Sequence, residues 1–304
     1  MTVLHFRWTV LIVAVVLSAC ATHHSLPPIA PRNDYGVIVM AHGGPKDWDE
    51  AVLTAVQPLE ARYPTEVAFG MADPAALQAS VSRLQAKGVH RIGVVRLFVS
   101  GESFQQRTAQ ILGLEAGAPP KPPSPDGGHQ HGVEGGEHDM ALWRIASSAS
   151  FAMADEGLLD APEMGDVLAD RAIHLSHHPE SEDVLVLAHG PGDDNENARW
   201  LSKLNARAEA IRQARPFRRV QVETLREDWP DKRKETEQRV RDFVTRARAE
   251  GGTAIVIPFR VQGFGPYAEV LKSLDYVSDG VGLLPDIHVT YWIERQAEAL
   301  RTKP

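Results

Sequence analysis

Three short segments of this sequence occur twice, in the same order, in its first and second halves. In the first pair an apolar run leads into Ala-His-Gly, the second pair ends in proline, and the third pair is an apolar run that ends in glycine. The copies lie at 35–45 and 183–192, at 69–74 and 225–230, and at 92–101 and 254–263. Because chance similarity does not preserve the order of separate segments, we predict two related halves. The length of 304 residues suits two domains, each with its own hydrophobic core.

Each half alternates segments typical of strands with segments typical of helices. Short apolar runs indicate buried strands, and apolar residues spaced three and four positions apart indicate helices. In the first half we expect strands at 37–41, 65–69, 91–99 and near 144–153, and helices at 49–62, 74–87 and near 104–112. Between the halves we expect a helix at 161–175, and in the second half we expect strands near 184–188, 220–224, 253–259 and 288–292.

This alternation is typical of parallel sheets that are covered by helices on both faces. The predicted fold class is therefore α/β, with two tandem domains that each contain a parallel four-stranded sheet flanked by helices. We place the first repeat at 34–155, a connecting helix at 156–180 and the second repeat at 181–304.

The first twenty residues are typical of a signal peptide. Arg7 supplies a positive charge, and residues 8–17 form an apolar run that is too short for an ordinary membrane span. The segment ends in Leu-Ser-Ala-Cys and resembles a bacterial lipobox, in which Cys20 carries the lipid. A plain signal peptide and an uncleaved anchor are the alternatives. With the lipobox, residues 21–33 form a tether, and we expect a lipoprotein in the periplasm or anchored to the outer membrane.

Composition excludes several kinds of site. The net charge of −8 argues against a general nucleic-acid or anionic-membrane surface, so we expect membrane contact through the lipid anchor alone and no nucleic-acid partner. A single cysteine rules out an intramolecular disulfide and a Cys-rich metal site. The glycine-rich motifs that bind nucleotides are absent, so we expect no nucleotide cofactor. The sequence leaves the oligomeric state open.

Two histidines stand at equivalent positions of the repeat. His42 and His189 each follow the first predicted strand of their half and precede glycine. Ligands of open parallel sheets bind at the carboxyl ends of the strands, and imidazole binds metals or moves a proton near neutral pH. We therefore regard both as candidate ligand-binding residues. The alternative is a histidine that is hydrogen-bonded to a neighbouring loop.

Residues 113–140 form a long insert that is rich in proline and glycine. Its side chains His129, His131 and His138 lie among carboxylates, and such tracts bind Ni²⁺, Co²⁺, Zn²⁺ or Cu²⁺ through imidazole. A solvated insert without a role is the alternative, because long loops of this kind are either functional or disordered.

Together, the strand that leads into Ala-His-Gly, the Asp-Pro at 73–74 and the third strand that leads into Leu-Phe-Val-Ser-Gly resemble the class II chelatases. These are the sirohydrochlorin cobalto- and ferrochelatases, and two tandem halves resemble their long form. The resemblance covers most of residues 34–300. It implies two domains that face each other across a cleft, a tetrapyrrole as partner, and insertion of Co²⁺, Ni²⁺ or Fe²⁺ as the metal substrate without ATP.

The resemblance also implies site residues. His42 matches the family histidine that follows the first strand, and His189 is its counterpart in the second half. The second family histidine follows the third strand and is missing from both halves here; Glu102 or Ser103 falls near its place in the first. We therefore predict His42 and Glu102 as the catalytic pair, because a base and a metal ligand on one side of the ring serve deprotonation and metal entry.

The predicted metal ligands are then His42, Glu102 and His189 in the domains, with His129, His131 and His138 in the insert. The second half is expected to be the poorer site, because His189 is its sole matching residue. Two functional hypotheses follow: an exported chelatase-like enzyme, or a periplasmic carrier of metal or tetrapyrrole with the same fold and no turnover. Catalytic turnover distinguishes the enzyme from the carrier.

Overall fold

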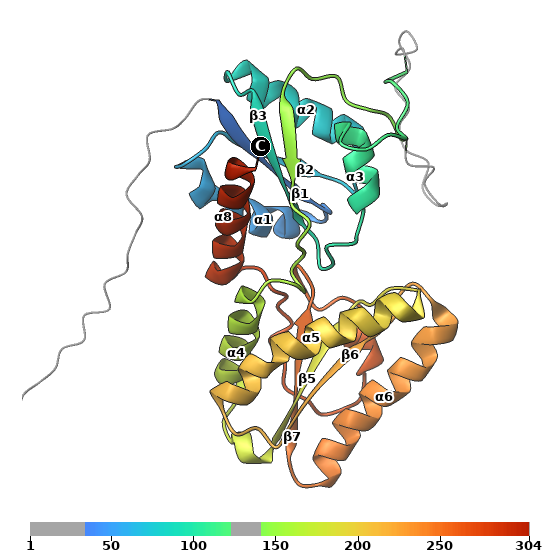
Figure 1. Ribbon diagram of the computed structural model, residues 1–304. Helices are drawn as coiled ribbons and strands as arrows, with labels where there is room; N and C mark the ends of the chain where they lie inside the picture. The colour runs from blue at the N-terminus through green and yellow to red at the C-terminus, as the bar shows by residue number, and fades with distance from the viewer. Residues whose placement is uncertain (1–33, 123–140, 304) are drawn as a thin grey trace, which may run out of the picture.

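The structure, a computed structural model, describes residues 34–122 and 141–303 (Figure 1). The chain folds into two α/β lobes, and each is built on a parallel sheet. The strand order is β2-β1-β3-β4 in the first lobe and β6-β5-β7 in the second. The predicted signal peptide, Cys20, the tether and the histidines of the insert lie outside the described residues. No helix within the described ranges is long and apolar enough to cross a membrane.

The first lobe confirms the strand and helix pattern predicted for the first half. The central strand β1 is buried along its whole length because it pairs with β2 on one side and β3 on the other. Its elements are β1 (Tyr35–Ala41), α1 (Lys46–Glu60), β2 (Thr65–Phe69), α2 (Pro74–Ala86), β3 (Arg91–Leu97), α3 (Gln105–Leu112) and β4 (Ser150–Met153). Apolar side chains of α1 cover one face of the sheet, and those of α2 and α3 cover the other.

The second lobe repeats this plan with one strand fewer. Its elements are α4 (Glu163–Leu175), the 3-10 turn η1 (Pro179–Ser181), β5 (Glu182–Ala188), α5 (Asp194–Ala214), β6 (Arg219–Thr224), α6 (Pro230–Ala249), β7 (Thr253–Phe259) and α7 (Tyr267–Val270). Where the first lobe has β4, the second has an isolated parallel bridge between Ile255 and Val277. The second sheet therefore has three strands instead of the four predicted.

The strand predicted near 288–292 is wrong, because this segment lies in helix α8 (Ile287–Thr302). The Asp286 side chain caps the helix by accepting a hydrogen bond from the His288 amide. Buried side chains then recur three and four residues apart at Val289, Trp292 and Ile293. This spacing places them on one helical face, whereas in a strand they would point to both sides.

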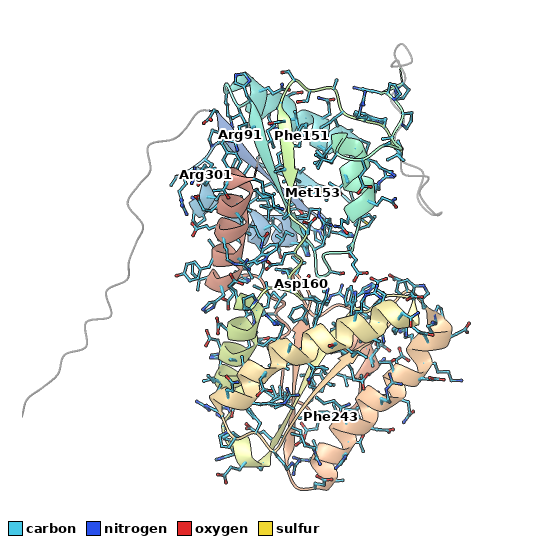
Figure 2. The ribbon with its side chains drawn as sticks, viewed as in Figure 1. Arg91, Phe151, Met153, Asp160, Phe243 and Arg301 are labelled. Carbon is cyan, nitrogen blue, oxygen red and sulfur yellow. The ribbon has the colours of Figure 1, made fainter. Side chains whose placement is uncertain are left out.

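The helices at the ends of the two halves are exchanged between the lobes. Helix α4 follows β4 in the chain but packs on α5 and β7, and α8 ends the second half but packs on α1 and β3 of the first lobe (Figure 1). The Tyr35 hydroxyl donates a hydrogen bond to the Ala297 carbonyl at 2.7 Å. Arg91 donates to the carbonyl of Arg301 at 2.8 Å (Figure 2). One continuous apolar core therefore runs through both lobes.

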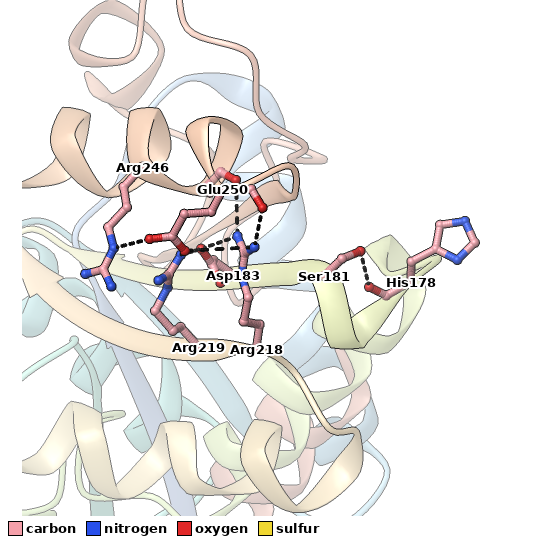
Figure 3. A network of polar contacts seen from close by, with 8 residues as sticks. His178, Ser181, Asp183, Arg218, Arg219, Arg246 and Glu250 are labelled. Atoms are coloured by element: carbon pink, nitrogen blue, oxygen red, sulfur yellow. Dashed lines mark hydrogen bonds and ion pairs between the residues drawn. The ribbon is translucent and has the colours of Figure 1, made fainter.

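A buried carboxylate anchors the amino end of β5. The Asp183 side chain is fully buried and accepts hydrogen bonds from Arg218 at 2.8 and 2.9 Å and from Arg219 (Figure 3). Arg219 also pairs with Glu250, and this contact together with Arg246 lowers the pKa of Glu250 to about 2. Burial alone raises the pKa of Asp183, but the two arginines outweigh it and lower that pKa below its usual value. The network fixes β5 against β6 at the end of the sheet remote from His189.

Candidate functional site

A cleft of about 430 Å³ lies where the carboxyl ends of strands from both lobes meet. Its lining includes the residues that directly follow β1, β3, β5 and β7, and two that follow β6. The lining residues are His42, Trp48, Phe98, Val99, Ser103, Phe104, His189, Trp200, Glu227, Asp228, Arg260, Val261 and Gln262. The structure thus brings His42 and His189 into one cleft, although 146 residues lie between them in the chain. Both lie at the carboxyl ends of the strands, where ligands of such folds bind.

His42 presents a free ring nitrogen to the cleft. Its Nδ1 donates a hydrogen bond to the Gly43 carbonyl at 2.8 Å, because a carbonyl oxygen only accepts. Gly43 has a φ of +82°, which glycine adopts without strain. No partner of Nε2 occurs among the described residues. Since a neutral imidazole has a single N–H, Nε2 keeps its lone pair and can bind a metal or accept a proton.

His189 makes the same backbone contact but has an acidic neighbour. Its Nδ1 donates to the Gly190 carbonyl at 2.7 Å, and its Nε2 lies 3.0 Å from Oδ2 of Asp228. Both ring nitrogens therefore face acceptors, while a neutral imidazole supplies one proton. A proton or a metal cation between Nε2 and the carboxylate would satisfy both groups. The Asp228 side chain is mostly exposed, so it has room to move with a bound cation.

A second carboxylate near His189 is held by an arginine. One oxygen of Glu227 pairs with Arg260, and the other lies 3.9 Å from Nε2 of His189. The Arg260 guanidinium lies 5.7 Å from the ring centre of the fully buried Tyr267. Burial and then the charge of Glu227 raise the pKa of Tyr267, so the phenol stays neutral. A Cβ at Gly265 would lie 2.7 Å from Arg260 Cζ, so glycine leaves room for the guanidinium.

The charged side chains of the cleft come from the second lobe, whereas three of its four Trp and Phe side chains come from the first. Trp48, Phe98 and Phe104 of the first lobe line it together with Trp200 of the second. The ring centres of Phe98 and Phe104 are 5.5 Å apart. Flat apolar side chains of this kind suit a planar ligand, because aromatic faces stack.

Sequence reasoning missed Glu227, Asp228 and Arg260. The signal was present in the repeated segments, where the two acids occupy the places of Met71 and Ala72 in the first copy. Arg260 likewise occupies the place of Phe98. The second lobe therefore carries the charged end of the cleft, although the sequence predicted it to be the poorer site. Across the described ranges, no three His, Cys, Asp or Glu side chains are arranged as a complete metal site.

Glu102 lies beside the cleft but is engaged by the opposite lobe. It accepts hydrogen bonds from Arg199 at 3.0 and 2.6 Å. These bonds lower the pKa of Glu102. Its neighbour Ser103 lines the cleft, whereas no contact between Glu102 and His42 occurs in the part of the chain that the structure describes.

Comparison with known proteins agrees with this architecture. No protein-family model matches the sequence, and no curated protein is found as a relative. The sirohydrochlorin chelatase SirB from Bacillus subtilis subspecies spizizenii, in complex with cobalt, is 11% identical, with a TM-score of 0.56 over 88% of this chain and 96% of that chain. SirB from Bacillus subtilis with Fe³⁺ is 12% identical, with the same TM-score and coverage.

A multi-domain protein from Deinococcus radiodurans, described as structurally similar to chelatases, is 18% identical with a TM-score of 0.55. The alignment covers 90% of this chain but 56% of that protein, so this chain spans about half of its length. The fold is therefore chelatase-like: two parallel α/β sheets flanked by helices, with the candidate site between them.

Proposed function

We propose that this protein inserts a divalent metal ion into sirohydrochlorin or a related tetrapyrrole, without ATP. The observation that carries the proposal is the pairing of His189 with Asp228 in the same cleft as the free Nε2 of His42. The aromatic side chains of the first lobe supply a surface for a planar ring, and the chelatase-like fold supports the assignment.

Different residues of the cleft bind the metal ion and accept a proton from the ring. Metal insertion requires that the ion loses water and that two pyrrole N–H protons leave the ring. His189 and Asp228 receive the ion, because imidazole and carboxylate are both ligands of Co²⁺, Ni²⁺ and Fe²⁺. His42 accepts a ring proton at Nε2, which is positioned by the hydrogen bond from its Nδ1. Solvent at the open cleft takes up the other proton.

A carrier of metal or tetrapyrrole that does no chemistry is the second candidate function. It is favoured by the absence of histidine in the segments that follow both third strands, at 97–104 and 258–266. It predicts saturable binding of one ligand without turnover.

The location and the role of the insert complete the proposal. We infer a lipid on Cys20 and a periplasmic or outer-membrane position from the lipobox-like sequence. We further propose that the insert histidines His129, His131 and His138 bind metal through imidazole. Replacement of Cys20 by alanine should release the protein from the membrane fraction; a protein that remains there contradicts the anchor.

The deciding experiment follows absorbance when residues 21–304 are mixed with sirohydrochlorin and Co²⁺. Multiple turnovers above the uncatalysed rate, lost in His42→Ala, support the enzyme. A spectral change that saturates at one equivalent supports the carrier. His90→Ala is the matched control. His90 is exposed and directly precedes β3, so it lies at the end of the strand opposite the cleft. If neither metal nor tetrapyrrole binds at micromolar concentration, both candidate functions are wrong.

A further inference from the structure

We propose that Arg260 is a positioning residue that keeps the metal affinity of the cleft low by holding Glu227 away from the ion. This inference rests on the proposed function, because it assumes that a divalent ion binds at His189 and Asp228. It concerns how tightly the ion is held before it is passed on.

The geometry around Glu227 carries the inference. The Glu227 side chain is about 10% exposed, and its two oxygens face different partners. Oε1 pairs with the Arg260 guanidinium, while Oε2 lies 3.9 Å from Nε2 of His189, beyond hydrogen-bond distance. Asp228, which is about 70% exposed, lies at 3.0 Å. Of the two adjacent carboxylates, the buried one is held back and the exposed one faces the imidazole.

The guanidinium is itself held in place. It lies over the buried ring of Tyr267, and Gly265 leaves the space that it occupies. Arginine stays protonated under all conditions in which proteins fold, so its charge permanently offsets that of Glu227. A cation at His189 therefore meets one free carboxylate instead of two.

Two protein ligands bind a divalent ion more weakly than three. Without Arg260, the nearly buried Glu227 would lack a counter-charge, and a cation at His189 would supply it. A weakly held ion suits a protein that passes it to a macrocycle, because each additional ligand must be released before the ion enters the ring. Arg260 thus lowers the affinity of the cleft for the ion and makes its release easier.

The test is Co²⁺ binding by titration calorimetry in residues 21–304, with His129, His131 and His138 replaced by alanine in every sample so that the insert does not contribute. We expect Arg260→Met and Arg260→Gln to tighten Co²⁺ binding about tenfold, the usual range for changes around a metal ligand. Adding Glu227→Gln to Arg260→Met should cancel the gain. Arg239→Met is the control for the lost charge, since Arg239 pairs with Glu223 outside the cleft.

The outcomes separate this inference from the proposed function. Tightening in both Arg260 variants that is cancelled by Glu227→Gln supports it. Unchanged or weaker binding in both variants overturns it, provided that His189→Ala abolishes binding in the Arg260 background. If His189→Ala does not alter Co²⁺ binding, the ion does not bind there, and the proposed function falls with the inference. Thermal melts of each variant confirm that it is folded.

Discussion

Glu102 of the first lobe and Arg199 of the second are joined by two hydrogen bonds, at 3.0 and 2.6 Å, beside the cleft. The residues that follow them in the chain, Ser103 and Trp200, line the cleft itself. The pair therefore links the lobes at the edge of the site. Lys203 and Asp160 form a second link at 2.8 Å, and Figure 2 shows Asp160 where the chain passes between the lobes.

The first prediction concerns the role of Glu102. Arg199 stabilises the carboxylate and lowers its pKa, which makes Glu102 a poor proton acceptor near neutral pH. We expect Glu102→Gln to keep the turnover rate within about threefold of the wild-type rate. We also expect the rate of ligand entry to depend less on salt, because salt screens surface ion pairs and the variant lacks the one with Arg199. Arg199→Gln should have the same effect. Stopped-flow binding at two salt concentrations measures it, and a loss of turnover in Glu102→Gln alone would favour the catalytic role instead.

The second prediction concerns Asp228. A proton and a metal ion compete for the same place between Nε2 of His189 and the carboxylate. Metal binding should therefore release the proton that otherwise lies there. Asp228→Asn should weaken Co²⁺ binding about tenfold or more, whereas Asp231→Asn, which lies in the same chain segment but outside the cleft lining, should not. Calorimetry in two buffers of different ionisation enthalpy measures affinity and released protons together, and binding that releases no proton would contradict the arrangement.

The third prediction concerns the exchanged helix α8. Trp292 is fully buried, and its Nε1 donates a hydrogen bond to Glu156 at 3.0 Å. Trp292→Ala should lower the free energy of unfolding by about 3–5 kcal/mol, because a large cavity opens in the core shared by the lobes. The neighbouring Tyr291 is 48% exposed, so Tyr291→Ala should change it by less than about 0.5 kcal/mol. Urea denaturation compares the two, and equal effects would show that α8 is not part of the core.

The fourth prediction concerns Asp183. Its partners Arg218 and Arg219 are about one quarter exposed, so Asp183→Asn should cost about 3 kcal/mol, near the lower limit for breaking a buried pair. Because the pKa of Asp183 is lowered in the folded protein, its contribution is present above the ordinary pKa of about 3.9 and is lost as pH falls through the lowered value.

Denaturation curves between pH 7 and pH 3 test this prediction. The stability difference between wild type and Asp183→Asn should shrink as the pH falls toward the acid end. A difference that stays constant over this range would contradict the assigned role of the ion pairs. Glu180→Gln, at an exposed position just before β5, is a suitable control.

The local pattern of the sequence predicted most of the fold. Apolar runs placed β1, β3, β5 and β7 within two residues of their ends, because buried parallel strands need continuous apolar residues. The segment near 288–292 was misread, since a five-residue window with apolar side chains fits a strand and a helix equally. The bridge at Val277 was missed because a single paired residue leaves no pattern.

The sequence by itself determined the repeat, the α/β alternation and the placement of His42 and His189 at strand ends, because these features depend on neighbours in the chain. The tertiary structure decided that α8 crosses to the first lobe and that Glu102 pairs with Arg199. It also decided that Asp228 lies next to His189, whereas Glu227 pairs with Arg260. Which carboxylate pairs with which cation depends on distances between segments far apart in the chain. Those distances are set when the two sheets pack on one core.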